Sequence, residues 1–93
     1  MAKTFNLTVD AAGGADSYTV QTKCSKLVAY EQAQAGTTDY SVYASPGSAT
    51  FVTKPAGSKY ELPAPPGRFF KPGDQPFAIG IAVGSVQFDV EES

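Results

Sequence analysis

The chain lacks the residues with which enzymes most often move protons or form covalent intermediates. Its 93 residues include no histidine, no tryptophan and one cysteine, Cys24. Without histidine, a nucleophile has only carboxylates or a buried lysine as its base, and no pattern marks such a residue. We therefore expect that the protein is not an enzyme and has no catalytic, cofactor-binding or metal-binding residues.

A single cysteine also excludes a disulfide within the chain. Stability must then come from the core, from strand pairing or from assembly with other chains. We expect Cys24 to be a small buried or half-buried apolar side chain, because no histidine is present to activate its thiol.

Charge is scarce and nearly balanced. Charged residues make up 17% of the chain, with seven Lys and Arg against nine Asp and Glu, and no basic block is present to bind a phosphate backbone. We therefore expect no nucleic-acid partner. Residues 1–4 lead directly into a strand pattern without an apolar leader, and no apolar run is long enough to span a bilayer. The expectation is a chain made in the cytoplasm, with no signal peptide and no membrane span.

Apolar and polar residues alternate in most segments, which is typical of half-buried strands. Strands are predicted over residues 3–9, 17–22, 23–31, 38–44, 49–53, 59–62, 77–83 and 85–91. Within 23–31, a bend between two sheets and a short helix are alternatives, and residues 31–35 are expected to form a loop or one turn. This pattern predicts one all-β domain, 1–93, built as a β-sandwich or small β-barrel of about seven or eight antiparallel strands.

Nine glycines and seven prolines divide these strands. Gly13-Gly14 indicates a flexible turn over 10–16, and Ser45-Pro46-Gly47-Ser48 indicates a tight turn. Residues 63–67 contain three prolines, which cannot donate to a ladder, so this segment is expected to be an exposed polyproline-like crossing or an edge cover.

The last two predicted strands are expected to form a hairpin. Residues 77–83 would pair with 85–91 across Gly84-Ser85, where glycine suits the first central position of a type II′ turn. Gly80 indicates either a bulge or the close approach of a neighbouring group.

Two groups of carboxylates are candidates for metal binding, and each has a simpler explanation. Asp10 and Asp16 flank the double glycine, where turn formation is favoured over calcium binding. Asp89, Glu91 and Glu92 are interpreted as a solvated row that protects a strand edge from unwanted pairing.

Aromatic residues offer two further candidate surfaces. Arg68-Phe69-Phe70-Lys71 mixes cations with rings, as single-strand nucleic-acid sites do, although the cations can equally cover the rings. Adjacent phenylalanines cannot both face the core of a regular strand, so one is expected to lie under the loop and the other to pack at an edge or interface. Four tyrosines either line a sugar-binding face or, as we favour, pack within the strands: Tyr30, Tyr40, Tyr43 and Tyr60.

Three segments together resemble small bacteriophage virion proteins of the capsid decoration, cement or head-fibre base type. They are Ala35-Gly36-Thr37-Thr38, then Leu62 to Phe70 before Pro72-Gly73-Asp74, and a short β-hairpin at the C-terminus. The resemblance implies a non-enzymatic virion protein that binds the outside of the assembled shell and stabilises it. Its partner would be the major capsid protein or another virion protein, and it would form a homo-oligomer, with a trimer as one possibility. The alternative is a receptor- or glycan-binding module of a phage tail or fibre.

The resemblance also implies a protein interface made by two segments. Ala2, Lys3, Thr4 and Phe5 would add a strand to a partner's open edge. The second segment, 63–74, would contribute an arm anchored by its aromatic side chains. The candidate interface residues of this arm are Pro65, Pro66, Arg68, Phe69, Phe70 and Lys71.

Overall fold

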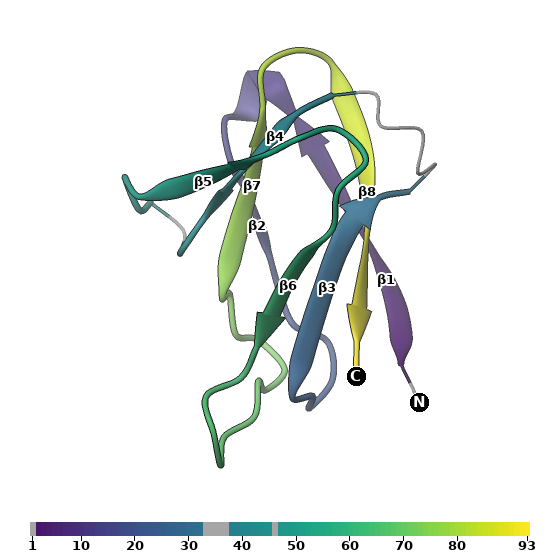
Figure 1. Cartoon of the computed structure of the whole chain (residues 1–93), viewed down its shortest axis with the longest axis vertical. Helices are drawn as coiled ribbons and strands as arrows, with labels where there is room; N and C mark the ends of the chain where they lie inside the picture. Colours follow the sequence, from purple (N-terminus) through teal and green to yellow (C-terminus); the bar gives the residue numbers. More distant parts are fainter. Residues whose placement is uncertain (1, 33–37, 46) are drawn as a thin grey trace.

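The computed structural model describes residues 2–32, 38–45 and 47–93 and shows two four-stranded antiparallel sheets (Figure 1). This is a small β-sandwich, so the all-β prediction is confirmed. The strands are β1 (Lys3–Asp10), β2 (Asp16–Tyr18), β3 (Lys26–Glu31), β4 (Tyr40–Tyr43), β5 (Phe51–Lys54), β6 (Tyr60–Pro63), β7 (Phe77–Ile81) and β8 (Ser85–Glu92). Within these residues, no helix is long and apolar enough to cross a membrane.

Three features expected from the sequence fall on residues outside the described part of the chain. They are most of the loop over 31–35, the Ala35-Gly36-Thr37 part of the resemblance, and Pro46 in the tight turn. Residues 26–31 form the strand β3, so the alternative of a helix there is wrong.

The last two strands do not pair with each other, so the predicted hairpin is wrong. Sheet A has the order β1-β8-β3-β6, and sheet B has the order β2-β7-β4-β5. The turn signal at Gly84 is real, with φ of 79°, but the chain uses it to cross from sheet B to sheet A. A local turn signal shows that the chain reverses, and it does not specify which strand the returning segment will pair with.

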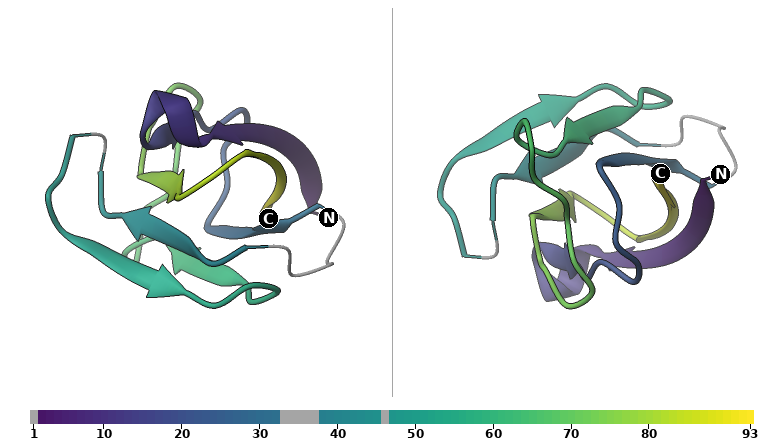
Figure 2. Two further views of the ribbon diagram at one scale, coloured as in Figure 1. Left: turned by 90° about the horizontal axis from the view of Figure 1, so that it is seen from above. Right: turned by 90° about the horizontal axis from the view of Figure 1, so that it is seen from below.

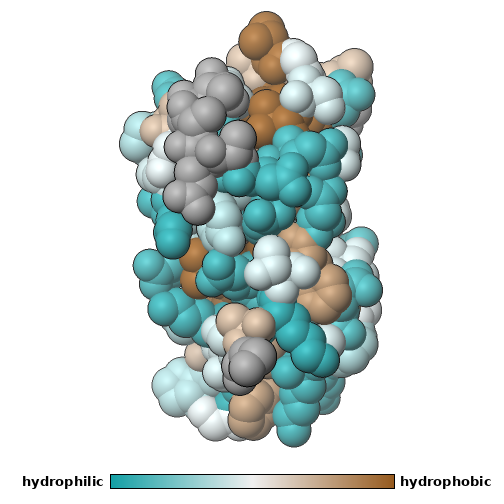
Figure 3. All heavy atoms as spheres, turned by 90° about the vertical axis from the view of Figure 1, so that its right-hand side faces the viewer, coloured by the Kyte–Doolittle hydropathy of each residue, from teal (hydrophilic) through white to brown (hydrophobic). Residues whose placement is uncertain are grey.

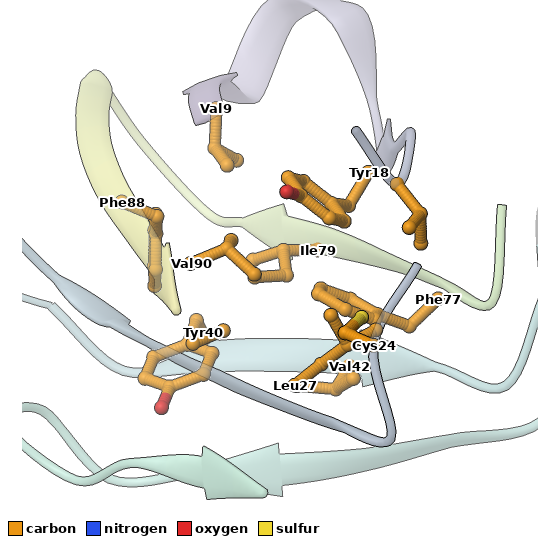
Figure 4. Close-up of a cluster of buried hydrophobic side chains, with 12 residues drawn as sticks. Val9, Tyr18, Cys24, Leu27, Tyr40, Val42, Phe77, Ile79, Phe88 and Val90 are labelled. Atoms are coloured by element: carbon orange, nitrogen blue, oxygen red, sulfur yellow. The ribbon is translucent and has the colours of Figure 1, made fainter. Parts of the chain in front are cut away.

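The core explains why this crossing is favourable. Phe77 and Ile79 from β7 meet Phe88 and Val90 from β8 between the two sheets, so both strands bury their apolar faces in the same layer (Figure 4). Two aromatic pairs bridge the layer as well. The Tyr40 and Phe88 rings meet edge to face with centroids 5.0 Å apart, and the Tyr60 and Phe77 rings do so at 5.6 Å.

The turn between β1 and β2 is a single 3-10 turn, Ala11–Gly13, rather than an unstructured reversal. An Asp10 side-chain oxygen accepts a hydrogen bond from Ala12 N at 2.9 Å, and Asp16 Oδ2 accepts one from Asp10 N at 2.9 Å. Both carboxylates therefore fix the turn, as favoured from the sequence. β2 is shorter than predicted, and residues 19–25 continue as an irregular segment that still buries Val20 and Cys24.

Candidate docking surface

The two predicted interface segments lie at opposite edges of sheet A. Residues 3–5 belong to β1 at one edge, whereas residues 64–74, called here the 64–74 arm, follow β6 at the other edge. The arm forms the loop at the bottom of Figure 1. Phe5 packs against the core, so β1 offers a partner its open backbone edge rather than an aromatic anchor. The structure therefore does not unite the two segments into one site.

The 64–74 arm is held against the irregular 19–25 segment by backbone hydrogen bonds. Cys24 and Phe70 form a reciprocal antiparallel bridge, with Cys24 N to Phe70 O at 3.1 Å and Phe70 N to Cys24 O at 2.8 Å. Val20 makes a second clasp, accepting from Gly73 N at 2.9 Å and donating to Asp74 O at 2.8 Å. These hydrogen bonds hold the second half of the arm at Phe70 and again at Gly73 and Asp74. Its backbone conformation is therefore fixed before a partner binds.

The two adjacent phenylalanines of the arm point in different directions, as expected from the sequence. Phe70 is half-buried and packs against the core. Phe69 is 51% exposed, and Lys23 Nζ lies 4.5 Å from the centroid of its ring. Phe69 is thus the one ring of the pair that a partner can reach.

Cations surround this exposed ring. Lys23, Arg68 and Lys71 are all exposed, and together with Phe69 they line a surface hollow of about 500 Å³. The carboxylate of Asp74 also lines the hollow, but its Oδ2 accepts a hydrogen bond from Lys71 N at 2.9 Å and so closes the turn. The chain as a whole carries a formal charge of −2. The hollow is therefore a positive, partly aromatic surface on an acidic protein, suited to carboxylates next to an apolar side chain.

A buried carboxylate, Glu92, supports the segment beneath the arm, so the expectation that Glu92 is solvated at a strand edge is wrong. Glu92 is 2% exposed, because it lies on the core-facing side of β8, which is a central strand rather than an edge. Its oxygens accept hydrogen bonds from the Tyr18 hydroxyl, from Gln21 N and Thr22 N at 2.8 Å each, and from Thr22 Oγ1 at 2.6 Å. Burial alone would raise the pKa of Glu92, but these hydrogen bonds together outweigh it and hold the pKa below its usual value.

A signal for this buried position was present in the sequence. Phe88, Val90 and Glu92 share one face of β8, since side chains alternate along a strand. Asp89 and Glu91 lie on the other, half-exposed face, as expected. Through residues 21 and 22, Glu92 fixes the same irregular segment to which the arm is clasped.

Cys24 and the tyrosines have structural roles. Cys24 is 5% exposed, and burial followed by the nearby Glu92 charge raises the pKa of its thiol. Tyr40 lies in the core and donates to Ser58 O at 2.7 Å, while Tyr60 packs against the core. Tyr30 and Tyr43 lie on the outer faces of different sheets, Tyr30 with its hydroxyl on Glu91 and Tyr43 against Phe51. The four rings therefore do not form a shared sugar-binding face.

Metal-binding side chains are dispersed. In the part of the chain that the structure describes, no group of three or more His, Cys, Asp or Glu residues is placed to hold a metal ion. Comparison of the chain with family models, with curated proteins and with solved structures found no match.

Proposed function

We propose that the protein is a non-enzymatic structural protein that docks through its 64–74 arm onto an acidic patch of a virion shell protein. The proposed partner follows from the resemblance to virion proteins, and the proposed mode of binding follows from the side chains of the arm. The observation that carries the proposal is the exposed Phe69 ring, flanked by Lys23, Arg68 and Lys71 on a loop clasped to the body. Aromatic and arginine side chains are the usual anchors of a binding hot spot.

The clasped arm suits repeated weak docking. Because its backbone is already fixed, little conformational entropy is lost on binding, so a small contact can still be specific. On a shell with many equivalent positions, several such contacts act together if the protein is oligomeric. We rank this role above the glycan-binding alternative, because the tyrosines are divided between the core and two outer faces.

Replacement of Phe69 by serine tests the arm as the docking site. Phe69→Ser should abolish co-sedimentation with shell particles purified from the source, with urea unfolding little changed, because the ring is exposed and does not pack against the core cluster. The matched control is Val83→Ser, which removes another exposed apolar side chain, 73% exposed, from the 82–84 link. Phe70 is unsuitable for this purpose, since it packs against the core.

Three results would overturn the proposal. The first is binding of Phe69→Ser to shells at the wild-type level. The second is absence of the wild-type chain from purified particles by quantitative mass spectrometry. The third is salt-sensitive binding to single-stranded DNA that depends on Phe69 while shells are not bound, which would make the hollow a nucleic-acid site.

A further inference from the structure

One edge strand of the sandwich differs from the others. β1, β2 and β6 each turn at least part of one face toward the core, whereas β5 exposes apolar side chains on both faces. Phe51 is 51% exposed on the outer face of sheet B, and Val52 is 54% exposed on the side that faces sheet A. An exposed apolar edge strand is the feature that proteins normally avoid unless another strand covers it.

The position of β5 explains why it is uncovered. Its strand lies at the periphery of the molecule, on the side away from β1, and extends beyond the body (Figures 1 and 2). The opposite side, where β1 lies, has a mostly hydrophilic surface with smaller apolar patches (Figure 3). Beside β5 lies an apolar notch of about 100 Å³, lined by Val42, Ala44, Thr50, Phe51, Val52 and Tyr60.

The backbone groups at the open edge can be assigned from the ladder. Ala44 N donates to Thr50 O at 3.4 Å, which makes these two residues a hydrogen-bonded pair. Bonded and non-bonded pairs alternate in an antiparallel ladder, so Phe51 and Thr53 direct their N–H and C=O groups away from β4. The 5.2 Å between the Phe51 and Tyr43 ring centroids fits a non-bonded pair, in which opposing side chains lie closer together.

We propose that β5 pairs with β5 of a second copy of this chain, antiparallel about a two-fold axis. Val52 of one copy lies opposite Val52 of the other, and each Phe51 lies opposite the other copy's Thr53. In this register every open N–H and C=O of Phe51 and Thr53 is bonded across the axis. The two B sheets then form one continuous eight-stranded sheet, and the valines meet beside the two apolar notches.

Other registers satisfy fewer groups. A two-residue shift in one direction places Phe51 opposite Pro55, which has no N–H to donate, and a shift in the other direction uses Ala49, which lies outside β5. Charge is compatible with the chosen register too. Lys54 lies opposite Thr50 of the other copy, so the two lysines are at opposite ends of the pairing and no like charges face each other.

This pairing refines the expectation of a homo-oligomer and does not depend on the function of the 64–74 arm. A two-fold axis closes the assembly at two copies and leaves no β5 edge open, so a dimer is expected rather than a trimer.

Analytical ultracentrifugation of the full chain over a wide concentration range tests the dimer. The wild type should reach a dimer plateau, and Val52→Lys should raise the dimer dissociation constant at least about tenfold, because two ammonium groups then face each other at the axis. Val83→Lys is the matched control and should leave the dissociation constant unchanged, since this valine is also exposed, at 73%, but lies in the 82–84 link and not in β5. Urea unfolding of each variant establishes that the monomer still folds.

A second measurement locates the contact. Hydrogen exchange at the Phe51 and Thr53 amides should slow as protein concentration rises, and the same amides in Val52→Lys should exchange rapidly at every concentration. A wild type that stays monomeric into the millimolar range would overturn the proposal. So would dimers that Val52→Lys does not weaken, or assembly that continues beyond two copies.

Discussion

At the scale of single residues, Glu92 shows how one carboxylate organises an irregular segment. Four donors from residues 18–22 converge on it in a site that is 2% exposed. The 19–25 segment lacks a strand partner over most of its length, so these bonds replace the ladder that would otherwise satisfy its backbone.

Glu92 should make stability depend on pH in the acidic range. Its pKa in the folded state is held below its unfolded value of about 4.3. The stabilisation is therefore complete above the unfolded pKa and is lost as the pH falls through the folded pKa. Glu92→Gln should lower the free energy of unfolding at pH 7 by about 2 kcal/mol, because its amide N–H₂ would face a donor instead of accepting from it. Urea unfolding across pH 3 to 7 measures both effects.

The difference between wild type and Glu92→Gln should shrink toward pH 3, since the wild-type carboxylate is then being protonated. Glu61→Gln is the control. Glu61 pairs with Lys26 at 2.8 Å on an exposed surface, so its replacement should have little effect at any pH. An equal effect of the two substitutions at pH 7 would contradict the assigned role of Glu92.

Gly80 and Glu92 show how well the surroundings of a single residue can be predicted from the sequence. The lone glycine within a strand predicted either a bulge or a close neighbour, and the second is found, since a Cβ built there would lie 3.3 Å from Tyr43 Cε1. Glu92 was missed because a carboxylate near the end of a chain is usually solvated. Alternation alone placed it on the core face, but the four donors that make burial favourable come from residues about 70 positions earlier.

At the scale of elements, the sequence predicted where strands lie better than how they pair. β1, β4 and β6 were found close to their expected bounds, because each alternates in polarity and ends at a turn residue. The prediction of a β7–β8 hairpin was wrong, because the strand with which a segment pairs depends on the packing of the whole core. The exposed edge of β5 could not be predicted either. Its residues alternate little in polarity, and nothing in their local sequence shows that sheet A does not extend over them.

The 64–74 arm should depend on one of its phenylalanines for stability and not on the other. Phe70→Ala should lower the free energy of unfolding by about 2 kcal/mol, roughly half of the cost of truncating a fully buried ring, because Phe70 is half-buried. It should also speed hydrogen exchange at Gly73 N, which is bonded to Val20 O. Phe69→Ala should change neither quantity, as the ring is exposed. Equal destabilisation by the two substitutions would mean that the arm is anchored differently.

At the scale of the whole molecule, the two ends of the chain meet in sheet A. Lys3 is paired with Glu92 at the end of the β1–β8 ladder, and both termini lie at the same end of Figure 1. β8 lies between β1 and β3, so the central pairings of sheet A cannot form until this last strand is in place. The 82–84 link, by contrast, joins strands that do not pair.

A circular permutant tests this topology. Joining the present termini with a short Gly/Ser linker, and opening the chain between Val83 and Gly84, should preserve the far-UV circular dichroism spectrum and a cooperative urea transition. The cut falls in an exposed link and breaks no strand pairing, and the linker spans neighbouring strands. Loss of cooperative unfolding would indicate that β7 and β8 do depend on their direct connection.

The two proposed contacts are separate, so a dimer formed through β5 would carry two 64–74 arms and could bind a repetitive surface at two points.

The clasp between Cys24 and Phe70 has a practical consequence. The only sulfhydryl of the chain lies in the core cluster, while the backbone of the same residue is bonded to the arm, and with its raised pKa the thiol remains protonated at neutral pH. A thiol-reactive dye can label this protein only after the packing around Cys24 has opened, so the native sequence contains its own chemical reporter of that opening.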